Sequence, residues 1–519
     1  MCVIPPSPFL ADAKVMASLG ILWVAASLIA AGHDVSVLDL EGRQDWREAV
    51  AVTINAERPD AVCVTGTSAH FPFCIEINRI VKATRPDTRT IIGGAHATMG
   101  PQSAARGGFD VVVMDDGLSG IHLALELGAP DHEETVPTRA GPITIKGVVR
   151  GPLVPTELWP LPARHLVDIR SYKYYLAGDP EKVSTIVMWT QGCPMGCLFC
   201  GGREIEFYRR YRVRPIEQVM AEMEHIRAAY GFEYVQAMDD EINIRKDWLL
   251  PFCAAMKDRK PVKGWRAFIK SELFTDEIAA AMASAGCIEV CTGVESGSDR
   301  ILKTWVRKNT TYAINKAAVE TARRHGVRLK AFCMVGNPGE TRDDVMLTRD
   351  WIMDAKPDSF DVTVFTPYPG SPIFNVLFPE EGRAQLPSPH MEGLPLDAPL
   401  PDFARESWFY KGVPGEYKSG TSTRGIDGSP GLTSLELVAL RDQIDAECKA
   451  ALGHDQAQRV SPVFAAQQVY EAGMGQTPAH TIRGPVIGGT KVAGGTVAGP
   501  CGLKPLPVVR TLVGGKDDG

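Results

Sequence analysis

Short apolar runs alternate with helix-like segments over residues 183 to about 370, and this alternation limits the possible fold more than any other feature. Each run has the length of a buried strand, and segments of helical period lie between the runs. The six predicted strands are Val183–Trp189, Tyr234–Met238, Trp265–Ile269, Ile288–Val294, Leu329–Val335 and Asp361–Phe365. Strands and helices that alternate in this way form a parallel sheet. Six units, rather than the eight of a closed barrel, predict a partial barrel with its active site at the carboxyl ends of the strands.

The helix after the first of these strands shows the pattern most clearly. Apolar side chains recur at helical spacing on one face of Pro215–Tyr230. Pro215 suits the first turn of a helix, and Gly231 suits its end. Three further helices are predicted, each opened by a threonine that can cap the first turn: Thr275–Ala285, Thr311–His325 and Thr341–Ala355.

The first 128 residues form another block of alternating strands and helices, and they predict a doubly wound, Rossmann-like α/β domain. The predicted strands are Val3–Ile4, Val35–Leu40, Ala61–Thr65, Thr90–Ile92 and, as the last, Val111–Val113, with helices at Leu19–Ala31, Trp46–Glu57 and Phe73–Arg85. Ligands of such folds bind at the carboxyl ends of the strands. Loops rich in glycine or serine follow several of these strands, so we expect a binding site at that edge.

The rest of the chain divides by composition. Residues 129–182 are rich in proline, glycine and turn formers, and they predict a linker between the N-terminal domain and the partial barrel of residues 183–372. Residues 373–455 predict a C-terminal region of loops with one helix at 432–452. Residues 456–519 lack helical period and predict a flexible tail.

Composition and charge exclude several classes of partner. The net charge is −7 and no basic block is present, which argues against nucleic-acid binding. The N-terminal stretch lacks the basic and apolar regions of a signal peptide. The longest apolar run, around residues 21–31, is too short to span a bilayer. Twelve cysteines in 519 residues do not suggest a disulfide scaffold, so we expect reduced thiols, a cytoplasmic location and no membrane partner.

Three cysteines follow the first barrel strand with the spacing Cys-x3-Cys-x2-Cys. Cys193, Cys197 and Cys200 therefore supply three thiolates from one tight loop. A closed 4Fe–4S cluster takes four ligands, so three thiolates leave one iron open to a substrate or cofactor. A zinc site is an alternative, but it usually takes its ligands in two pairs, and no second pair with such spacing is present. A disulfide between two of these cysteines is another alternative, and it would leave the third thiol unpaired.

This motif, with an aromatic residue before its last cysteine, resembles that of the radical S-adenosylmethionine (SAM) superfamily. The resemblance implies a cluster whose open iron binds SAM and splits it to a 5′-deoxyadenosyl radical, using an electron from an external flavodoxin- or ferredoxin-type donor. It also implies SAM contacts on the loop after the cysteines and on the loops after the barrel strands. The candidates are Gly201, Gly202, Asp239, Asp240, Lys270, Glu295, Ser296 and Gly336.

Some of these candidates have simpler structural explanations, which the sequence leaves open. The acids Asp239-Asp240-Glu241 follow the second barrel strand and can form a solvated turn that caps a helix. Lys270 and Glu295 follow the third and fourth strands and can form a buried ion pair. Tyr368, in the turn after the sixth strand, can line the cavity or pack in the core.

The N-terminal block is similar to the cobalamin-binding domain of one large class of radical SAM enzymes, on the stretch Gly-His-Asp-Val at 32–35 and the segment Gly93–Thr98. The similarity implies cobalamin contacts at Pro6, Ser7, Thr67, Ser68, His70, Gly93, Gly94 and His96. The Asp-x-His-x-x-Gly loop that supplies a cobalt ligand in many cobalamin enzymes is absent from the sequence. We therefore expect base-off cobalamin without a protein histidine beneath the metal. A nucleotide-type fold that binds no cofactor is the alternative.

Together, the two resemblances imply a cobalamin-dependent radical SAM methyltransferase. It would move a methyl group from methylcobalamin to an unactivated carbon, or to phosphorus, of a small-molecule substrate. The alternatives are a cobalamin-dependent cyclase or rearrangement enzyme, and an enzyme that has the cluster but no cobalamin. The composition and single-chain layout suggest a monomer that tailors a secondary metabolite, for instance in antibiotic biosynthesis.

Overall fold

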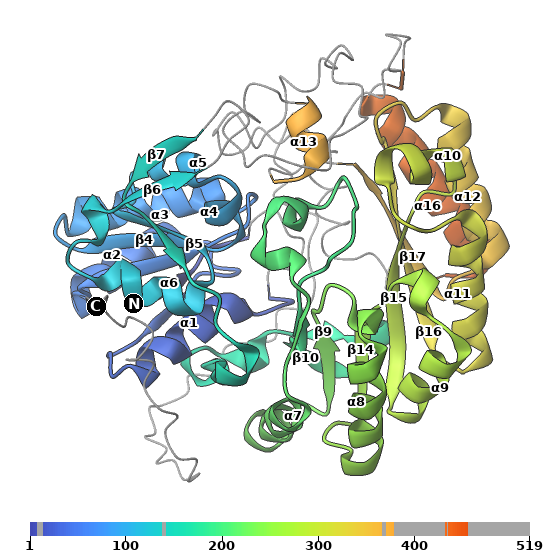
Figure 1. Ribbon diagram of the computed structural model, residues 1–519, viewed down its shortest axis with the longest axis horizontal. Helices are drawn as coiled ribbons and strands as arrows, with labels where there is room; N and C mark the ends of the chain where they lie inside the picture. Colours follow the sequence, from blue (N-terminus) through green and yellow to red (C-terminus); the bar gives the residue numbers. More distant parts are fainter. Residues whose placement is uncertain (8–13, 137–141, 366–369, 378–430, 433, 455–519) are drawn as a thin grey trace, which may run out of the picture.

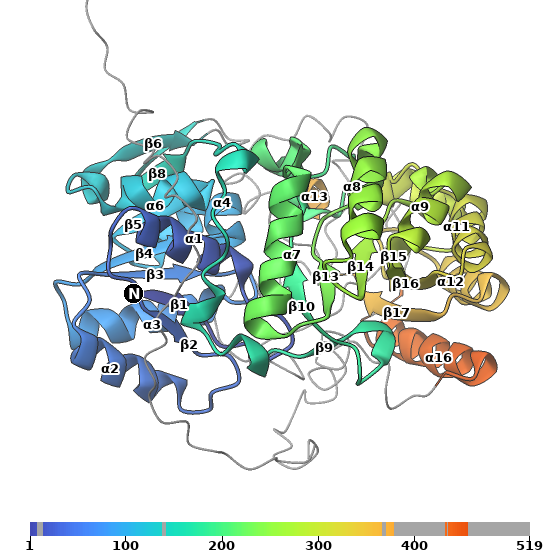
Figure 2. The same cartoon turned by 90° about the horizontal axis from the view of Figure 1, so that it is seen from below.

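The computed structural model describes residues 1–7, 14–136, 142–365, 370–377, 431–432 and 434–454. Two α/β units lie side by side, each built on its own sheet (Figures 1 and 2). The N-terminal unit is coloured blue to cyan in Figure 1, and the second unit runs from green to orange. Tyr368 and the predicted tail of residues 456–519 lie outside the described residues.

The N-terminal sheet is parallel throughout, as predicted for a doubly wound fold. Its strand order is β2 (Val37–Asp39), β1 (Cys2–Ile4), β3 (Ala61–Thr65), β4 (Arg89–Gly93), β5 (Val111–Asp115) and β8 (Val148–Gly151). The order reverses direction at β1, where the chain first goes to β2 and then returns past β1 to β3. In open α/β sheets a crevice for ligands forms at the carboxyl ends beside such a reversal.

Helices cover both faces of this sheet. Its helices are α1 (Leu19–Ala30), α2 (Trp46–Glu57), α3 (Phe71–Thr84), α4 (Ala95–Met99), α5 (Pro101–Arg106) and α6 (Gly117–Leu125). Buried side chains of α1 and α6 share one core cluster, whereas those of α2 and α3 share another with the opposite strand face. Strands buried on both faces read as continuous apolar runs, which is why Val111–Val113 and its neighbours were recognisable in the sequence.

The prediction that Val111–Val113 is the last strand of this sheet is wrong. Strand β8 extends the sheet beyond β5, and an antiparallel hairpin of β6 (Glu133–Val136) and β7 (Ile143–Lys146) precedes it. All three strands fall within the segment predicted as a linker. The segment is rich in turn formers, and β8 has only four residues, so no long apolar run marked it. The N-terminal sheet therefore continues past residue 128.

The second sheet is an open, curled parallel sheet, and all six predicted strands are present in it. Its order is β17 (Ser359–Val364), β16 (Arg328–Val335), β15 (Cys287–Glu295), β14 (Gly264–Phe268), β13 (Tyr234–Ala237), β10 (Val183–Val187) and β9 (Tyr174–Tyr175). Only β9 runs antiparallel, along the edge of β10. This is the partial barrel predicted from the sequence.

Helices lie between consecutive strands of the partial barrel and cover its outer face (Figure 1). The helices are α7 (Ile216–Tyr230), α8 (Lys246–Arg259), α9 (Asp276–Ser284), α11 (Tyr312–Arg324) and α12 (Arg342–Ala355). The three predicted threonine caps are confirmed, because Thr275, Thr311 and Thr341 each accept a hydrogen bond from a backbone N–H in the first turn. Helix α7 ends as predicted at Gly231, which has a φ of 70°.

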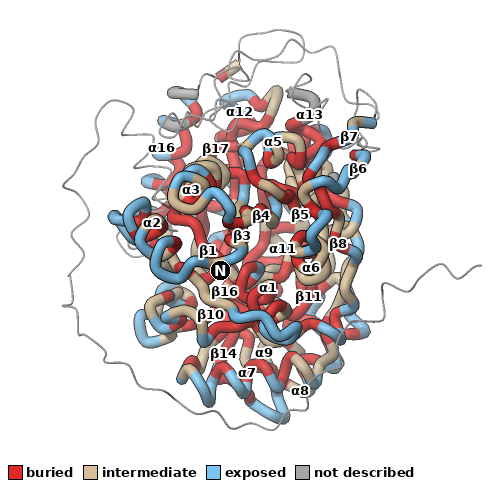
Figure 3. The backbone as a smooth tube through the Cα atoms, turned by 90° about the vertical axis from the view of Figure 1, so that its left-hand side faces the viewer, coloured by how far each residue is buried: buried red, intermediate tan, exposed pale blue. Residues whose placement is uncertain are grey.

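The C-terminal region contributes α13 (Pro372–Leu377) and α16 (Ser434–Leu452). The second of these corresponds to the helix predicted at 432–452 and packs against α12 and β17. Buried residues gather on the strands, whereas the outer turns of helices such as α2 are exposed (Figure 3). Among the described residues, no helix combines the length and the apolar character that crossing a bilayer requires.

The two sheets are joined by a shared core. One cluster of buried side chains extends from Ile4 and Leu22 in the N-terminal unit to Val187 and Trp189 in the barrel. Within the segment predicted as a linker, the Trp159 ring meets Trp23 of α1 edge to face, with a centroid separation of 5.2 Å. This segment therefore fixes the orientation of the two units instead of separating them.

Candidate active site

The cysteine loop lies at the carboxyl end of β10, as predicted. It runs from β11 (Thr190–Gln191) to a short 3-10 helix, η6 (Gly201–Glu204). The backbone N–H of Cys193 donates to the carbonyl of Tyr208 (2.8 Å), and that of Leu198 donates to the carbonyl of Val306 (3.1 Å). All three thiols of the motif are free and partly exposed. Backbone hydrogen bonds therefore hold the loop at both Cys193 and Leu198.

Two buried carboxylates hold this loop. Asp239 accepts hydrogen bonds from the backbone N–H groups of Trp189 and Thr190, both at 2.7 Å. Asp240 accepts from the backbone N–H of Gly192 (3.0 Å) and from the Tyr208 hydroxyl (2.6 Å).

The idea of a solvated, helix-capping turn is therefore wrong for these acids. Asp239 is only 2% exposed, and burial raises its pKa to about 7. The side chains of Asp239 and Asp240 bind the start of the cysteine loop, which sequence spacing could not show because nearly fifty residues separate the partners. In this structure both acids position the loop.

The thiols are held in surroundings that disfavour bare thiolates. Burial raises the pKa of Cys193 and of Cys200 to about 12, and it also raises the pKa of Cys197, which the nearby Lys308 opposes. When a thiol binds iron it loses its proton, and the positive charge of the iron stabilises the buried thiolate. Among the described residues, no three His, Cys, Asp or Glu side chains are placed so that they could bind one single metal ion. In a cluster each thiolate binds a different iron, and three free thiols on one anchored loop fit that need.

A group of buried charges lies behind Cys197. It consists of Glu241, Lys270, Glu272, Glu295 and Lys308. Lys308 forms an ion pair with Glu295 (3.1 Å) and donates to the carbonyl of Gly293 (2.6 Å). Lys270 pairs with Glu272. The suggested Lys270–Glu295 ion pair is therefore wrong, because each residue has a different partner.

Lys308 is a member of the site that sequence reasoning missed. It follows a short helical segment, η10 (Leu302–Val306), and nothing in its local sequence distinguishes it from a surface lysine. The structure buries it, with 7% exposure, between the cysteine loop and β15. Such a buried cation requires nearby carboxylates, and Glu295 and Glu241 supply them.

The end of β15 has a strained backbone. Glu295 has a φ of +65°, which is uncommon for a residue other than glycine, and the strand register shifts between Gly293 and Glu295. A Cβ atom on Gly293 would lie 1.9 Å from a carboxylate oxygen of Glu295. Ser296 follows and is fully buried. Strain of this kind persists where the surroundings enforce it and is common at functional sites.

A second tight loop follows β16. Gly336 has a φ of +94°, and its backbone N–H donates to the Glu340 carboxylate, as does that of Asn337 (2.9 Å). Glu340 is 1% exposed, and burial raises its pKa to about 7. Thus Gly336, Glu295, Lys270 and the cysteine loop all lie at the carboxyl edge of the barrel strands, as predicted.

The predicted cobalamin contacts gather at the carboxyl edge of the N-terminal sheet. Ser7 follows β1, Thr67 and His70 follow β3, and Gly94 follows β4 with a φ of +93°. The Ser7 hydroxyl hydrogen-bonds to His70 Nε2 (2.8 Å), so the loops after β1 and β3 are in direct contact.

His96 is buried, and both of its ring nitrogens are engaged, Nδ1 with Ser68 (3.0 Å) and Nε2 with Ser103 (3.3 Å). Its ring stacks on Phe71 at a centroid separation of 3.9 Å. Burial lowers the pKa of His96 to about 4, so the ring is neutral at pH 7. These contacts give His96 a packing role within the edge.

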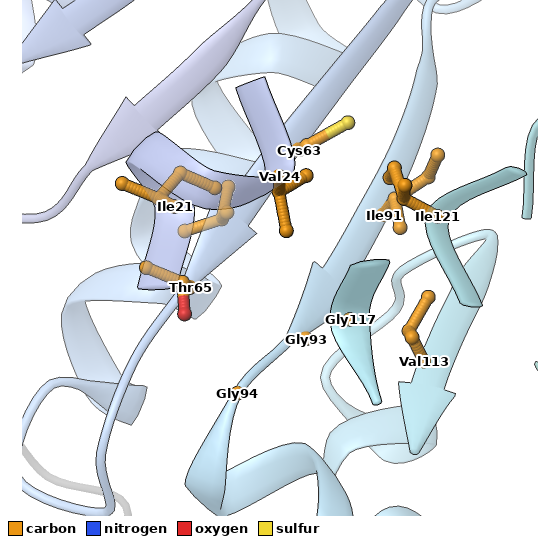
Figure 4. A pocket seen from close by; sticks show the side chains of 11 residues that line it. Ile21, Val24, Cys63, Thr65, Ile91, Gly93, Gly94, Val113, Gly117 and Ile121 are labelled. Atoms are coloured by element: carbon orange, nitrogen blue, oxygen red, sulfur yellow. The ribbon is translucent and has the colours of Figure 1, made fainter. Parts of the chain in front are cut away.

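A small apolar pocket opens beneath this edge, with a cavity volume of about 40 Å³. Figure 4 shows Ile21 and Val24 of α1 and Ile121 of α6 facing strand residues such as Ile91, with Gly93 and Gly94 at one end. A pocket of this kind suits a flat, apolar part of a ligand, with its polar parts at the rim.

The two carboxyl edges face one another. Gly370, just before α13, has a φ of +83°, and a Cβ atom there would lie 2.6 Å from the Met99 sulfur and 2.9 Å from the Gly201 carbonyl oxygen. Met99 belongs to α4 of the N-terminal unit, and Gly201 directly follows the last cysteine of the loop. The predicted cobalamin edge and the predicted cluster loop are thus within contact distance of one residue.

Comparison with known proteins agrees with both halves of the site. A B12-binding domain model matches residues 12–121, and a radical SAM superfamily model matches residues 187–352. The uncharacterized methyltransferase PH0819 of Pyrococcus horikoshii is 27% identical over 69% of this chain and 77% of its own length. Hopanoid C-3 methylase of Methylococcus capsulatus is 28% identical over 75% of this chain and 74% of its own length.

Solved structures show the same fold. The radical SAM methyltransferase TsrM from Kitasatospora setae superposes with a TM-score of 0.54 at 20% identity, over 72% of this chain and 75% of its own. The cobalamin-dependent radical enzyme OxsB superposes with a TM-score of 0.54 at 15% identity, over 68% of this chain and 52% of its own.

The fold and the site define an α/β enzyme in which a three-cysteine loop on a partial barrel faces a Rossmann-like ligand edge. The chain belongs to the B12-binding radical SAM enzymes. Its cofactors are a 4Fe–4S cluster, SAM and cobalamin.

Proposed function

We propose that this enzyme is a methyltransferase that moves a methyl group from methylcobalamin to an unactivated carbon of a small molecule. Support comes from the relatives, since PH0819, hopanoid C-3 methylase and TsrM are all named as methylating proteins. Another relative is named cytidylyl-2-hydroxyethylphosphonate methyltransferase, from Streptomyces wedmorensis, which places phosphonates among the candidate substrates. The observation that carries the proposal is the meeting of the two edges at Gly370, because methyl transfer between cofactors requires a common cavity.

The cofactors supply a cobalt-bound methyl group and a radical that can remove hydrogen from a carbon that no acid–base group could deprotonate. The protein's part is to bind and orient them. We assign cluster ligation to the three cysteines of the loop and loop positioning to Asp239 and Asp240. SAM binding is assigned to Gly201, Gly202, Lys270, Glu295, Ser296 and Gly336.

Cobalamin binding is assigned to the carboxyl edge of the N-terminal sheet. The proposed contacts are Pro6, Ser7, Thr67, Ser68, His70, Gly93, Gly94 and His96. We propose that the nucleotide arm of base-off cobalamin lies against this apolar pocket beneath Gly93. Neutral His96 is fully bonded within the protein, which agrees with a cobalt that takes no ligand from this side chain.

The inner face of the barrel sheet offers a surface for the substrate. Phe268 of β14 and Phe332 of β16 are half-buried and stack at a centroid separation of 5.9 Å. Lys330 lies over the Phe332 ring at 5.3 Å and pairs with Asp361 (2.9 Å). The alternate residues of these strands, such as Trp265, pack outward under the helices. We propose that an apolar part of the substrate rests on the two rings, with a polar part towards Lys330.

The test uses anaerobically reconstituted enzyme with SAM, cobalamin and a reducing system of the flavodoxin or ferredoxin type. Formation of 5′-deoxyadenosine reports the radical step, and substrates are found by comparing metabolite extracts with and without the enzyme. A product that gains one CH2 supports methyl transfer. A product of unchanged carbon count with a new ring or a rearranged skeleton would overturn it in favour of the second candidate, a cyclase or rearrangement enzyme. That candidate rests on the relatives named anaerobic magnesium-protoporphyrin IX monomethyl ester cyclase.

A role in secondary metabolism is part of the proposal, on the grounds of the protein's composition and its single-chain layout. The neighbouring genes check it. Genes for the assembly of a secondary metabolite would support this role, and genes for central metabolism or membrane lipids would contradict it.

A further inference from the structure

A chain of hydrogen bonds runs through the cobalamin edge and ends on a carboxyl group that sequence analysis did not select. The Ser7 hydroxyl donates to Glu41 Oε1 (2.8 Å) and also bonds His70 Nε2 (2.8 Å). On the other side of the ring, His70 Nδ1 bonds the Thr67 hydroxyl (2.8 Å). Ser7, Glu41 and Thr67 follow β1, β2 and β3, so the chain crosses the edge beside the reversal of strand order.

The direction of the hydrogen bonds is defined when Glu41 is ionised. The backbone N–H of Thr67 points at His70 Nδ1 (3.4 Å), so this nitrogen is the acceptor and Nε2 carries the proton. Nε2–H then donates to Ser7, and the Ser7 hydroxyl donates to the Glu41 carboxylate. The Thr67 hydroxyl donates inward to Nδ1, and it offers only acceptor lone pairs to a ligand.

Protonation of Glu41 reverses this order. A neutral Glu41 donates to Ser7, Ser7 then donates to Nε2, and the ring changes to the Nδ1–H tautomer, which gives up the long hydrogen bond from the Thr67 backbone N–H (3.4 Å). Nδ1–H donates to Thr67, and the Thr67 hydroxyl proton becomes free to point outward. Thr67 is the exposed end of the chain, whereas Ser7 and Glu41 are buried.

Glu41 is placed so that it can take up a proton. It is 7% exposed, and its second oxygen, Oε2, has no hydrogen-bond partner among the described residues. Its pKa is raised to about 7, mainly by burial and also by Asp39, against the lowering effects of Ser7 and Lys14. Among the described residues, the other titratable groups beside it are His70, which shares Ser7 with it, and Tyr172, which hydrogen-bonds to Asp39 (2.9 Å). Burial lowers the pKa of His70 to about 4 and raises that of Tyr172, so neither changes charge near pH 7.

We propose that the Glu41–Ser7–His70–Thr67 chain is a proton-linked part of the cobalamin site, which presents Thr67 to the bound cofactor as an acceptor or as a donor according to the protonation of Glu41. A cofactor that covers the edge removes water from Glu41 and thereby disfavours its carboxylate. Binding therefore takes up a proton, and affinity falls as pH rises through the neutral range. The proposal rests on cobalamin binding at this edge.

The test is calorimetric titration of the full-length, cluster-loaded protein with cyanocobalamin in buffers of different ionisation enthalpy. We expect uptake of about half a proton per cobalamin at pH 7 and a Kd that rises by up to about tenfold per pH unit between pH 7 and 8. Glu41→Gln should abolish the uptake and flatten the profile at the low-pH affinity. Proton exchange by the ligand itself cancels in the difference between the two proteins.

Three further variants separate linkage from folding. Ser7→Ala removes a hydrogen bond that lowers the pKa of Glu41, so the pH range of the uptake should move upward, whereas Ser7→Thr, which keeps the hydroxyl, should retain the wild-type profile. Glu57→Gln is the matched control, because Glu57 also accepts from a serine, Ser36 (2.7 Å), but on the exposed surface. If cobalamin binds but proton uptake is absent in the wild type, or is unchanged in Glu41→Gln, the proposed proton linkage through this chain is refuted. Failure of the wild type to bind cobalamin would refute the site itself.

Discussion

Removing a single oxygen atom from Tyr208 should loosen the cysteine loop. The Tyr208 hydroxyl donates to Asp240 (2.6 Å), and its carbonyl accepts from the backbone N–H of Cys193 (2.8 Å), so this residue joins the carboxylate to the first thiol. Tyr208→Phe keeps the ring and the backbone but leaves Asp240 with Gly192 as its remaining hydrogen-bond donor. Buried hydrogen bonds to a charged group contribute about 1.5–3 kcal/mol.

A loss of that size corresponds to a shift of roughly 10- to 150-fold towards open forms of the loop, because each tenfold change is about 1.4 kcal/mol. The assay is the rate at which an external chelator removes iron from the reconstituted cluster. If iron leaves through the open loop, this rate should rise by the same roughly 10- to 150-fold factor. Iron and sulfide per chain before the challenge should still approach those of the wild type.

The matched control is Tyr312→Phe, which breaks another tyrosine–aspartate bond, from Tyr312 to Asp354 (3.0 Å). That pair is exposed and remote from the cysteines, so iron release should remain within about twofold of the wild type. If Tyr208→Phe also stays within about twofold, the reasoning that Asp240 holds the loop through Tyr208 fails.

Four other outcomes are expected. Cys197→Ala should abolish iron binding and 5′-deoxyadenosine formation together, and turnover that survives would contradict a three-thiolate cluster. Lys308→Met leaves Glu295 without its partner and should lower the free energy of unfolding by about 3–5 kcal/mol, with recovery in the Lys308→Met, Glu295→Gln double variant; denaturant titration checks both. Gly370→Ala should reduce methylated product by up to about 100-fold while iron content and cobalamin affinity stay unchanged, because only the juxtaposition of the cofactors is altered; an unchanged product yield would contradict this. Burial raises the pKa of Glu340 to about 7, so the folded state binds more protons than the unfolded state and stability falls as pH rises from about 4.5 to 7. Glu340→Gln should reduce that slope by up to about 1.4 kcal/mol per pH unit, and thermal unfolding across this range would show no change if the carboxyl were ionised throughout.

Local patterns were sufficient to predict most of the strands and helices. The barrel strands are short segments rich in apolar residues, and the threonine caps and Gly231 act on their own turns. Such features depend on residues that are close together in the chain, so they can be predicted from the sequence. Strand β8 was missed for the same reason, because its four residues have meaning only beside β5.

The cysteine motif could also be predicted from the sequence, since ligand spacing on one loop is a local property. The side-chain contacts around the cysteine loop could not be predicted in this way. Asp239 and Asp240 were candidates for contact with SAM, and the structure shows that they also bind the backbone at the start of the loop. Lys270 and Glu295 could have paired with each other, but Lys308 pairs with Glu295 and Lys270 pairs with Glu272.

The sequence by itself determined which elements form and which three sulfur atoms could hold the cluster, because both depend on short-range order along the chain. Only the tertiary structure decided which buried charges meet, how Ser7 and Glu41 join His70 into one chain of hydrogen bonds, and that Met99 and Gly201 meet at Gly370. These contacts join residues from separate strands and separate sheets. Their energy comes from burial and from the low dielectric around the paired groups, which exist only once the sheets have packed together.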